Sequence, residues 1–277
     1  TSYISTNAYA EFENIFGGKH YIKLLGGYNY EQQDYRATKS ERNGLLMPDV
    51  EDINFAMGET MSITSDASRW RYAGAFFRLN YSYDNRYLFE VNGRYDGSSK
   101  FPNNSQWGFF PSASAAWRLS EERFWKVDPK FLSNVKLRMS YGALGNSNVN
   151  PYSYLEKFSL STFSTTGTST DGRYLDGSAK LRYTKNPSQI PDNIGWETSK
   201  TVDVGIDLGF LHNKITLSAD YYVRKTIDMY TVGPTLPDTF GASSPKGNYA
   251  DMSTYGYEIS LGYNDSFKLA DRPLSFG

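Results

Sequence analysis

The sequence predicts an all-β chain, an antiparallel transmembrane β-barrel segment of nine strands and the start of a tenth. Apolar and polar residues alternate with a period of two, which is typical of a strand with two unlike faces. All but one of the alternating runs are 9 to 13 residues long. Strands of soluble proteins centre on about 5 to 6 residues, whereas a tilted strand needs about 9–11 to cross a bilayer. The connections alternate between short and long, as in outer-membrane barrels.

Composition excludes several other classes of protein. The 277 residues contain no cysteine, which rules out disulfides, thiolate metal sites and a cysteine nucleophile. The 29 basic and 30 acidic side chains give a net charge of −1, so nucleic acid is not expected as a partner. Mean hydropathy is −0.57, yet 23 Tyr, 17 Phe and 24 Gly are too many for a disordered chain. The composition is that of an ordered, β-rich protein.

The alternation is clearest at 87–96, where Tyr87, Phe89 and Val91 oppose Glu90 and Arg94. Equally regular runs lie at 73–84, 135–141, 201–210, 214–224 and 255–264, and weaker ones at 2–13, 20–30 and 107–119. The apolar positions are predicted to face lipid and their neighbours to face the lumen. The lipid-facing set includes Phe77, Val91, Leu137, Ile206, Leu217 and Ile259.

The connections give the predicted orientation. Short links are expected at 14–19, 84–86, 120–133, 211–213 and 265–273, and we interpret them as periplasmic turns. Long connections are expected at 31–69, 97–106, 143–199 and 225–252, and we interpret them as extracellular loops. Aromatic residues gather at the strand ends, as interfacial girdles require.

Neither end of the chain has the features of a natural terminus. Residues 1–14 lack a signal peptide, and no apolar run approaches the roughly 20 residues of a membrane helix. The chain stops where a tenth strand begins, near 273–277. We therefore expect a piece of a longer protein.

Several segments have sequences that resemble one family. They are RYLFEVNGRYDGSSKF at 86–101, WGFFPSASAAWRLSE at 107–121, NVKLRMSYG at 134–142 with Gly145 and Asn146, WETSKTVDVGIDLGFL at 196–211, DYYVRKT at 220–226 and GYEISLG at 256–262. In combination and in this order they resemble the barrel of SusC/RagA-type TonB-dependent transporters of Bacteroidetes. Residues 1–69 agree with that family in pattern only.

The resemblance implies a fold and a function. It implies that residues 1–277 are part of a roughly 22-stranded barrel, with the plug domain, TonB box and signal peptide absent. It implies location in the outer membrane, energised import of oligosaccharides or peptides, TonB as the energy-coupling partner and a SusD-like surface lipoprotein above the barrel. Two alternatives stay open: a receptor for siderophores or other ligands of TonB-dependent proteins, and a surface structural or adhesive β-domain without transport.

No enzymatic activity and no cofactor are expected. His20 and His212 adjoin short turns, away from the side where a surface hydrolase would act. Two S-x-x-K matches, at 133–136 and 243–246, follow no helix signal and are more simply turn residues. No nucleotide-binding or metal-binding spacing occurs in the sequence.

The candidate site residues fall into two groups. Charged residues at lumen-facing positions could contact a substrate or the plug, although cross-strand pairing explains each of them more simply. They are Arg78, Glu90, Arg94, Lys136, Arg138, Asp203, Asp207 and Glu258. Aromatic residues of the long loops could stack on sugar rings or peptides; they are Tyr152, Tyr154, Tyr174, Tyr183 and Trp196. The Ser- and Thr-rich loops suit neutral, hydroxyl-rich ligands.

Overall fold

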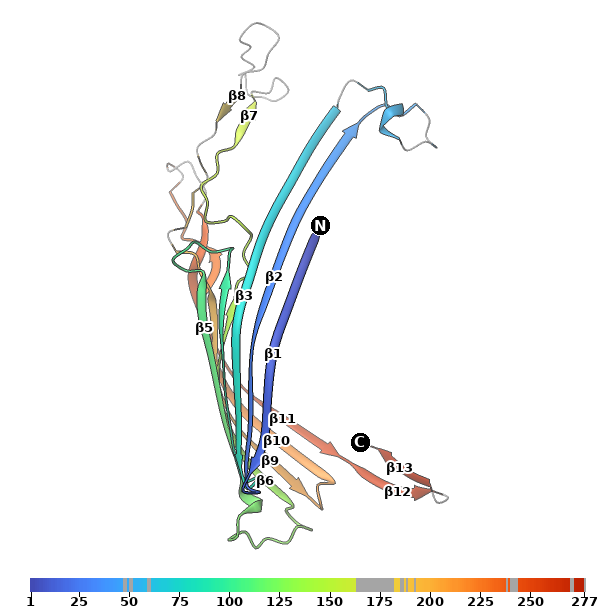
Figure 1. Ribbon diagram of the computed structural model, residues 1–277, viewed down its shortest axis with the longest axis vertical. Helices are drawn as coiled ribbons and strands as arrows, with labels where there is room; N and C mark the ends of the chain where they lie inside the picture. Colours follow the sequence, from blue (N-terminus) through green and yellow to red (C-terminus); the bar gives the residue numbers. More distant parts are fainter. Residues whose placement is uncertain are drawn as a thin grey trace.

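One curved antiparallel sheet of nine strands dominates the structure (Figure 1). This computed structural model describes residues 1–46, 52–58, 61–162, 182–184, 193–237, 244–269 and 272–276, together with 49, 187, 189–191 and 239. The strands pair in the order β1 (Ser2–Phe16), β2 (His20–Arg42), β3 (Met61–Tyr83), β4 (Tyr87–Ser98), β5 (Trp107–Arg118), β6 (Asn134–Asn146), β9 (Glu197–Phe210), β10 (Ile215–Val232) and β11 (Lys246–Tyr263). The sheet is an open, curved wall.

Smaller elements lie outside this sheet. The short strands β7 (Leu160–Thr162) and β8 (Arg182–Thr184) pair with each other, as do β12 (Asp265–Leu269) and β13 (Arg272–Phe276). Two single-turn 3-10 helices, η1 (Ile53–Phe55) and η2 (Leu119–Glu121), lie in connections. Among the described residues, no helix has both the length and the apolar character that a membrane crossing requires.

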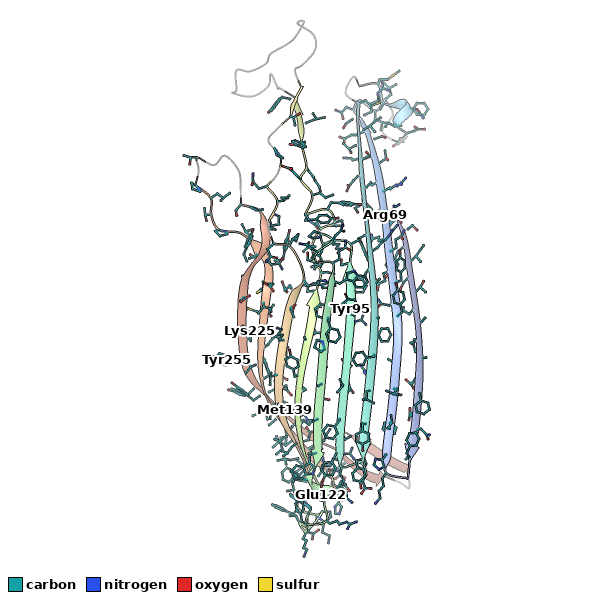
Figure 2. The ribbon with its side chains drawn as sticks, turned by 60° about the vertical axis from the view of Figure 1, so that its left-hand side comes forward. Arg69, Tyr95, Glu122, Met139, Lys225 and Tyr255 are labelled. Carbon is teal, nitrogen blue, oxygen red and sulfur yellow. The ribbon has the colours of Figure 1, made fainter. Side chains whose placement is uncertain are left out.

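The register places the predicted apolar positions on one face of the sheet. Val91 lies opposite Leu79 and Ala113, and Leu137 lies opposite Ile206. Large apolar side chains on this face are exposed, for example Val91 at 44% and Ile259 at 69%. An apolar face of this extent on a single-layer sheet requires an apolar surrounding. Figure 2 shows side chains projecting from both faces along the whole sheet.

Aromatic rings on the apolar face form two bands. At the turn end, Tyr87 stacks between Tyr83 and Trp117, at 6.4 and 6.3 Å between ring centroids. Eight residues further along β4, Tyr95 stacks on Trp107 at 5.1 Å. Eight strand residues span about 26 Å along the strand, which at a tilt of about 35–45° gives roughly 20 Å across the membrane, close to the apolar band of about 25 Å in outer-membrane barrels. The predicted pair of aromatic girdles is therefore present in the structure.

The expected long loops are shorter than the sequence predicted. Strands β2 and β3 pair without interruption from His20 with Tyr83 to Arg42 with Met61, so 31–69 is mostly strand. The connection is 43–60. Residues 31–42 and 61–72 are largely polar because this two-stranded extension rises beyond the apolar band (Figure 1), where no lipid-facing alternation is needed. The prediction of a loop at 31–69 was therefore wrong.

The prediction of a loop at 225–252 was wrong in the same way, because the strands on either side extend into this range. Strand β10 continues to Val232 and β11 begins at Lys246, with register shifts between Thr226 and Tyr230 that mark the change from the regular wall. The connections 99–106 and 147–196 agree with the prediction to within a few residues.

The expected turn at 265–273 was also wrong. The short/long rhythm of the connections suggested a link, but β12 occupies Asp265–Leu269 and pairs with β13. Phe267 and Leu269 alternate with Ser266 and Lys268, a period-two pattern that favours a strand. The predicted tenth strand is therefore the second strand of a separate hairpin (Figure 1).

A small apolar cluster lies at the loop end of the sheet. Phe101, Val149 and Ile194 are buried, with Phe101 at 0% exposure, and Tyr154, Trp196 and Tyr230 pack against them. Asn248 ties two of these segments together, since its side chain accepts a hydrogen bond from the Gly195 amide at 2.8 Å and donates to the Gly195 carbonyl at 3.3 Å. The loop end is therefore a packed collar, which fixes the position of the residues below it.

Candidate functional site: the concave wall and its upper recess

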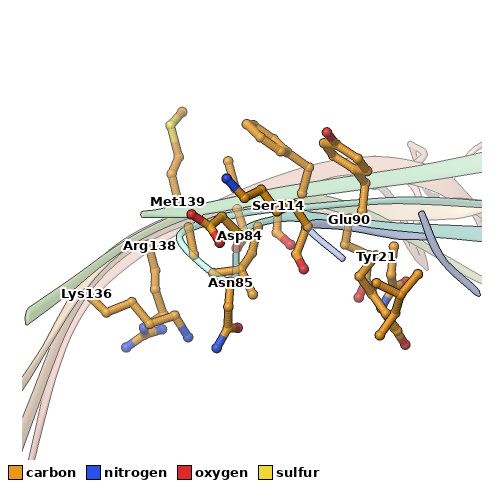
Figure 3. Close-up of a pocket in the computed structure, with 18 of the residues that line it drawn as sticks. Tyr21, Asp84, Asn85, Glu90, Ser114, Lys136, Arg138 and Met139 are labelled. Atoms are coloured by element: carbon orange, nitrogen blue, oxygen red, sulfur yellow. The ribbon is translucent and has the colours of Figure 1, made fainter. Parts of the chain in front are cut away.

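Charged and polar side chains occupy the second face of the sheet. The register links Glu90, Ser114, Ser140 and Asp203 across β4, β5, β6 and β9. The sheet bends toward the side that carries Lys136 and Arg138, whereas Met139 projects to the opposite side (Figure 3). This face is therefore the concave one. It carries every charged residue assigned to the lumen from the sequence: Arg78, Glu90, Arg94, Lys136, Arg138, Asp203, Asp207 and Glu258.

Arg138 lies at the centre of an ion-pair network across three strands. Its guanidinium donates two hydrogen bonds of 2.8 Å to Asp207 and contacts Asp220 at 3.0 Å. It also donates to the Ser218 hydroxyl at 2.9 Å. Bidentate arginine–carboxylate pairs fix geometry as well as adding energy. Gly205 lies beneath the network, where a Cβ would come within 2.0 Å of an Asp220 oxygen.

A second network lies higher on the wall, in β2 and β4. Arg94 donates to both Asp96 oxygens at 3.1 and 3.0 Å and to Asn29 Oδ1 at 3.3 Å. The guanidinium also lies over the Phe76 ring at 5.5 Å. Asp96 is 4% exposed, so its charge needs this partner. Gly74 leaves the room for it.

A third, weaker pair joins Arg78 and Glu90 at 3.6 Å. Half-exposed pairs of this kind contribute little to stability. The cross-strand interpretation therefore holds for Arg78 with Glu90 and for Arg138 with Asp207, whereas Arg94 pairs with Asp96 of its own strand.

A hollow of about 800 Å³ follows the lower part of the concave wall (Figure 3). Its concave-face lining includes Tyr21, Glu90, Lys136, Arg138 and Asp203. Side chains of the apolar face, such as Met139, also border it, because the sheet is one layer thick. It is an open trough rather than an enclosed pocket.

The upper recess is a smaller hollow of about 450 Å³ that lies on the concave face below the collar. Its lining combines two aromatic rings, two cations, one carboxylate, one amide and two hydroxyls: Asn29, Glu31, Trp70, Tyr72, Arg94, Ser98, Lys100 and Ser147. Trp70 is held by a hydrogen bond from its indole nitrogen to Gln33 at 2.9 Å. Aromatic rings beside a few convergent polar groups are typical of ligand sites.

Lys100 is partly buried in this recess. Its ammonium nitrogen lies 5.4 Å from the centre of the Trp70 ring. Burial lowers the pKa of Lys100 below its ordinary value. A desolvated ammonium favours a nearby negative charge.

The predicted loop aromatics occupy different environments. The hydroxyl of Tyr152 accepts a hydrogen bond from the Arg69 amide at 3.1 Å, and Lys157 lies over its ring at 5.8 Å. Tyr154 packs on the apolar cluster of the collar. Tyr183 is 37% exposed in β8, and Tyr174 lies outside the described residues.

Trp196 is the most constrained of these aromatics. Its ring contacts Phe101 at 5.3 Å and Phe110 at 5.2 Å, and its indole nitrogen donates to the Gln106 carbonyl at 2.9 Å. These contacts hold the collar together. The Trp196 ring also contacts the Tyr72 ring of the upper recess, edge to face, at 6.3 Å between ring centres.

Sequence reasoning missed Trp70, Tyr72 and Lys100. Trp70 and Tyr72 fall just before the expected strand start at 73, and Lys100 falls in an expected loop. The available signal was the even-numbered alternation of Trp70 and Tyr72 with Phe76 and Arg78, which continues the concave face beyond the expected strand end.

At the opposite end of the wall, Glu122 fixes the 119–133 connection to the aromatic band. Its carboxylate accepts hydrogen bonds from the Tyr87 hydroxyl at 2.5 Å and the Trp117 indole at 3.0 Å. The bond from Tyr87, followed by that from Trp117, lowers the pKa of Glu122. Figure 2 places Glu122 at this end and Arg69 near the other. Within the described residues, no group of His, Asp and Glu side chains has a metal-binding arrangement.

Comparison with known proteins supports the same architecture. The RagAB peptide transporter has a TM-score of 0.79 at 22% identity, covering 96% of this chain and 28% of that one. The siderophore receptor PirA of Acinetobacter baumannii has a TM-score of 0.56 at 16% identity, covering 94% and 34%. At these identities the likeness shows the fold alone.

Relatives in sequence are closer. TonB-dependent receptor P3 of Formosa agariphila is 35% identical over 262 residues, which are 94% of this chain and 25% of that protein. TonB-dependent receptor SusC of Bacteroides thetaiotaomicron is 32% identical over 260 residues, 93% and 24% respectively. The chain thus spans about a quarter of the length of these relatives. The family described as "TonB dependent receptor-like, beta-barrel" matches residues 1–277. The chain belongs to the TonB-dependent receptor family, as part of its β-barrel.

Proposed function

We propose that this chain forms part of the barrel wall of a transporter that imports oligosaccharides or peptides. TonB-dependent receptors of this kind are outer-membrane transporters. The observation that carries the proposal is the two-faced sheet, with exposed apolar side chains on the convex face and paired charges on the concave face. Such a wall separates lipid from a polar lumen.

The ligand class is chosen from the better-matching relatives. SusC is 32% identical, and the peptide transporter RagAB fits the fold at a TM-score of 0.79, against 0.56 for the siderophore receptor. The aromatic and hydroxyl-bearing upper recess suits sugar rings or peptides, through stacking and hydrogen bonds. We assign no catalytic role to the wall.

Two partners belong to the proposal. Energy would come from TonB, acting on parts of the full-length protein that precede this segment. A SusD-like lipoprotein would cover the loop end, where the packed collar of Phe101, Val149 and Ile194 offers a firm support. Residues 1–277 would then be a partial barrel domain of a longer protein with a plug.

Growth of a strain that lacks the gene tests the proposal. The strain is grown on single glycans and peptides as carbon sources, and separately under iron limitation. We expect a defect on one glycan or peptide class, restored by the full-length gene. A defect only under iron limitation would favour a siderophore receptor, and normal growth throughout would favour a structural surface domain.

A further inference from the structure

The upper recess contains a cation without an acidic partner. Lys100 follows β4, and the ion pairs of the described residues include Arg94, its neighbour in the recess, but not Lys100. Burial is the sole cause of its lowered pKa, with no carboxylate opposing the effect. The ring of Trp70, 5.4 Å away, is its principal stabilising contact. A half-buried ammonium in this state gains free energy when an anion approaches.

The other charged groups of the recess, and the Asn29 oxygen, already have partners. Arg94 is held by Asp96, and Asn29 Oδ1 accepts from Arg94. A Glu31 oxygen accepts from the Tyr3 hydroxyl at 2.9 Å. Lys100 is therefore the cation of the recess that forms no ion pair within the residues that the structure describes, and its ammonium offers three donors to a ligand.

We propose that the upper recess binds an anionic group of the imported ligand, a carboxylate or a sulfate, through Lys100, while the rings of Trp70 and Tyr72 pack against the adjoining part of the ligand. The volume of about 450 Å³ accommodates one or two sugar or peptide residues. The inference rests on the proposed import function and adds that the imported ligand carries a negative charge. The loops suit hydroxyl-rich ligands, and the recess selects those that also carry an acid.

The test uses purified full-length transporter and matched pairs of probes in titration calorimetry. The pairs are tetragalacturonate with its full methyl ester, a sulfated tetragalactose with tetragalactose, and tetraglutamate with tetraglutamine. We expect binding of the acidic member of one pair at least tenfold tighter than its neutral counterpart. One charge-assisted hydrogen bond gives a factor of that size.

Variants test whether Lys100 is the residue that binds the anionic group. Lys100→Met should weaken binding of the acidic probe about tenfold or more and leave the neutral probe unchanged, and Lys100→Arg should restore most of the affinity. Lys157→Met is the matched control, because Lys157 also lies over an aromatic ring, that of Tyr152, but outside the recess. That variant should bind both probes as the parent does.

The outcomes separate this inference from the import function. Equal binding of acidic and neutral probes, or tight binding of neutral probes alone, would overturn the inference and leave import intact. If Lys100→Met lowers the urea midpoint but leaves the affinity for the acidic probe unchanged, Lys100 serves an internal contact, and the inference is also overturned. No binding of any probe, with a growth defect only under iron limitation, would overturn both.

Discussion

Replacing Val91 by arginine should destabilise the protein much more than replacing Ser114 by arginine. Val91 lies on β4, four residues from Tyr87 and four from Tyr95, which belong to the two aromatic bands. Each interval spans about 13 Å, so Val91 is at the middle of the apolar band. It is 44% exposed on the convex face. An arginine at the bilayer midplane costs about 2–4 kcal/mol.

Ser114 is the matched control. It lies on the neighbouring strand β5, on the concave face, directly opposite Glu90. An arginine there gains a carboxylate partner and remains in a polar lumen, so the free energy of unfolding should change by less than about 1 kcal/mol. Asp207 is a poorer lumen control, because its replacement would also break the bidentate pair with Arg138.

The assay is urea unfolding of the full-length protein refolded into lipid vesicles, followed by tryptophan fluorescence. The expected cost of Val91→Arg, about 2–4 kcal/mol, corresponds to about 30-fold or more in the folding equilibrium and exceeds the change expected for Ser114→Arg. Equal destabilisation, or a larger loss for Ser114→Arg, would refute the assignment of the two faces.

Three further outcomes follow from the structure. Gly205→Ala should lower stability by about 1–3 kcal/mol by overpacking the arginine network. Gly142→Ala should not, because its new Cβ meets nothing closer than 3.6 Å. Urea unfolding midpoints compare the two variants, and equal midpoints would contradict the packing account. The folded-state pKa of Glu122 is depressed, so its stabilising contribution is present above the unfolded pKa and is lost as pH falls through the folded pKa. Glu122→Gln should therefore lose less stability on acidification than the parent protein. An unchanged pH profile of stability would contradict this role of Glu122. Single cysteines at Ser40 and Lys19 in the full-length protein should be labelled from outside intact cells at Ser40 only, and the reverse pattern would invert the orientation.

The transmembrane part of the wall could be predicted because lipid imposes a pattern. Val91 and Ile259 must be apolar to face hydrocarbon and Arg138 polar to face the lumen, so period two survives in the sequence. Strands β2 and β3 above the apolar band need no lipid-facing side chains, and apart from Trp70 and Tyr72 no alternation distinguishes them from a loop. Their pairing is a property of the backbone, which the side-chain pattern at 31–42 and 61–72 does not record.

The candidate site was predictable only in part, for a related reason. Placement of the charged residues on one face follows from periodicity, and the structure agrees with it for the whole set. The upper recess depends on long-range contacts: Trp70 and Lys100 are 30 positions apart in the chain, and Ser147 comes from a third segment. Which charges pair within the wall, such as Arg94 with Asp96, depends on rotamers that spacing does not fix.

A nitroxide scan along residues 87–96 tests the two-faced wall most directly. Spin labels are placed singly in the full-length protein in lipid vesicles, and their accessibility to oxygen and to a water-soluble nickel complex is measured. The account predicts a period of two, with oxygen favoured at Phe89, Val91 and Gly93 and the nickel complex favoured at Glu90, Asn92 and Arg94. Uniform accessibility along the strand, or the same alternation with the two reagents exchanged, would contradict it.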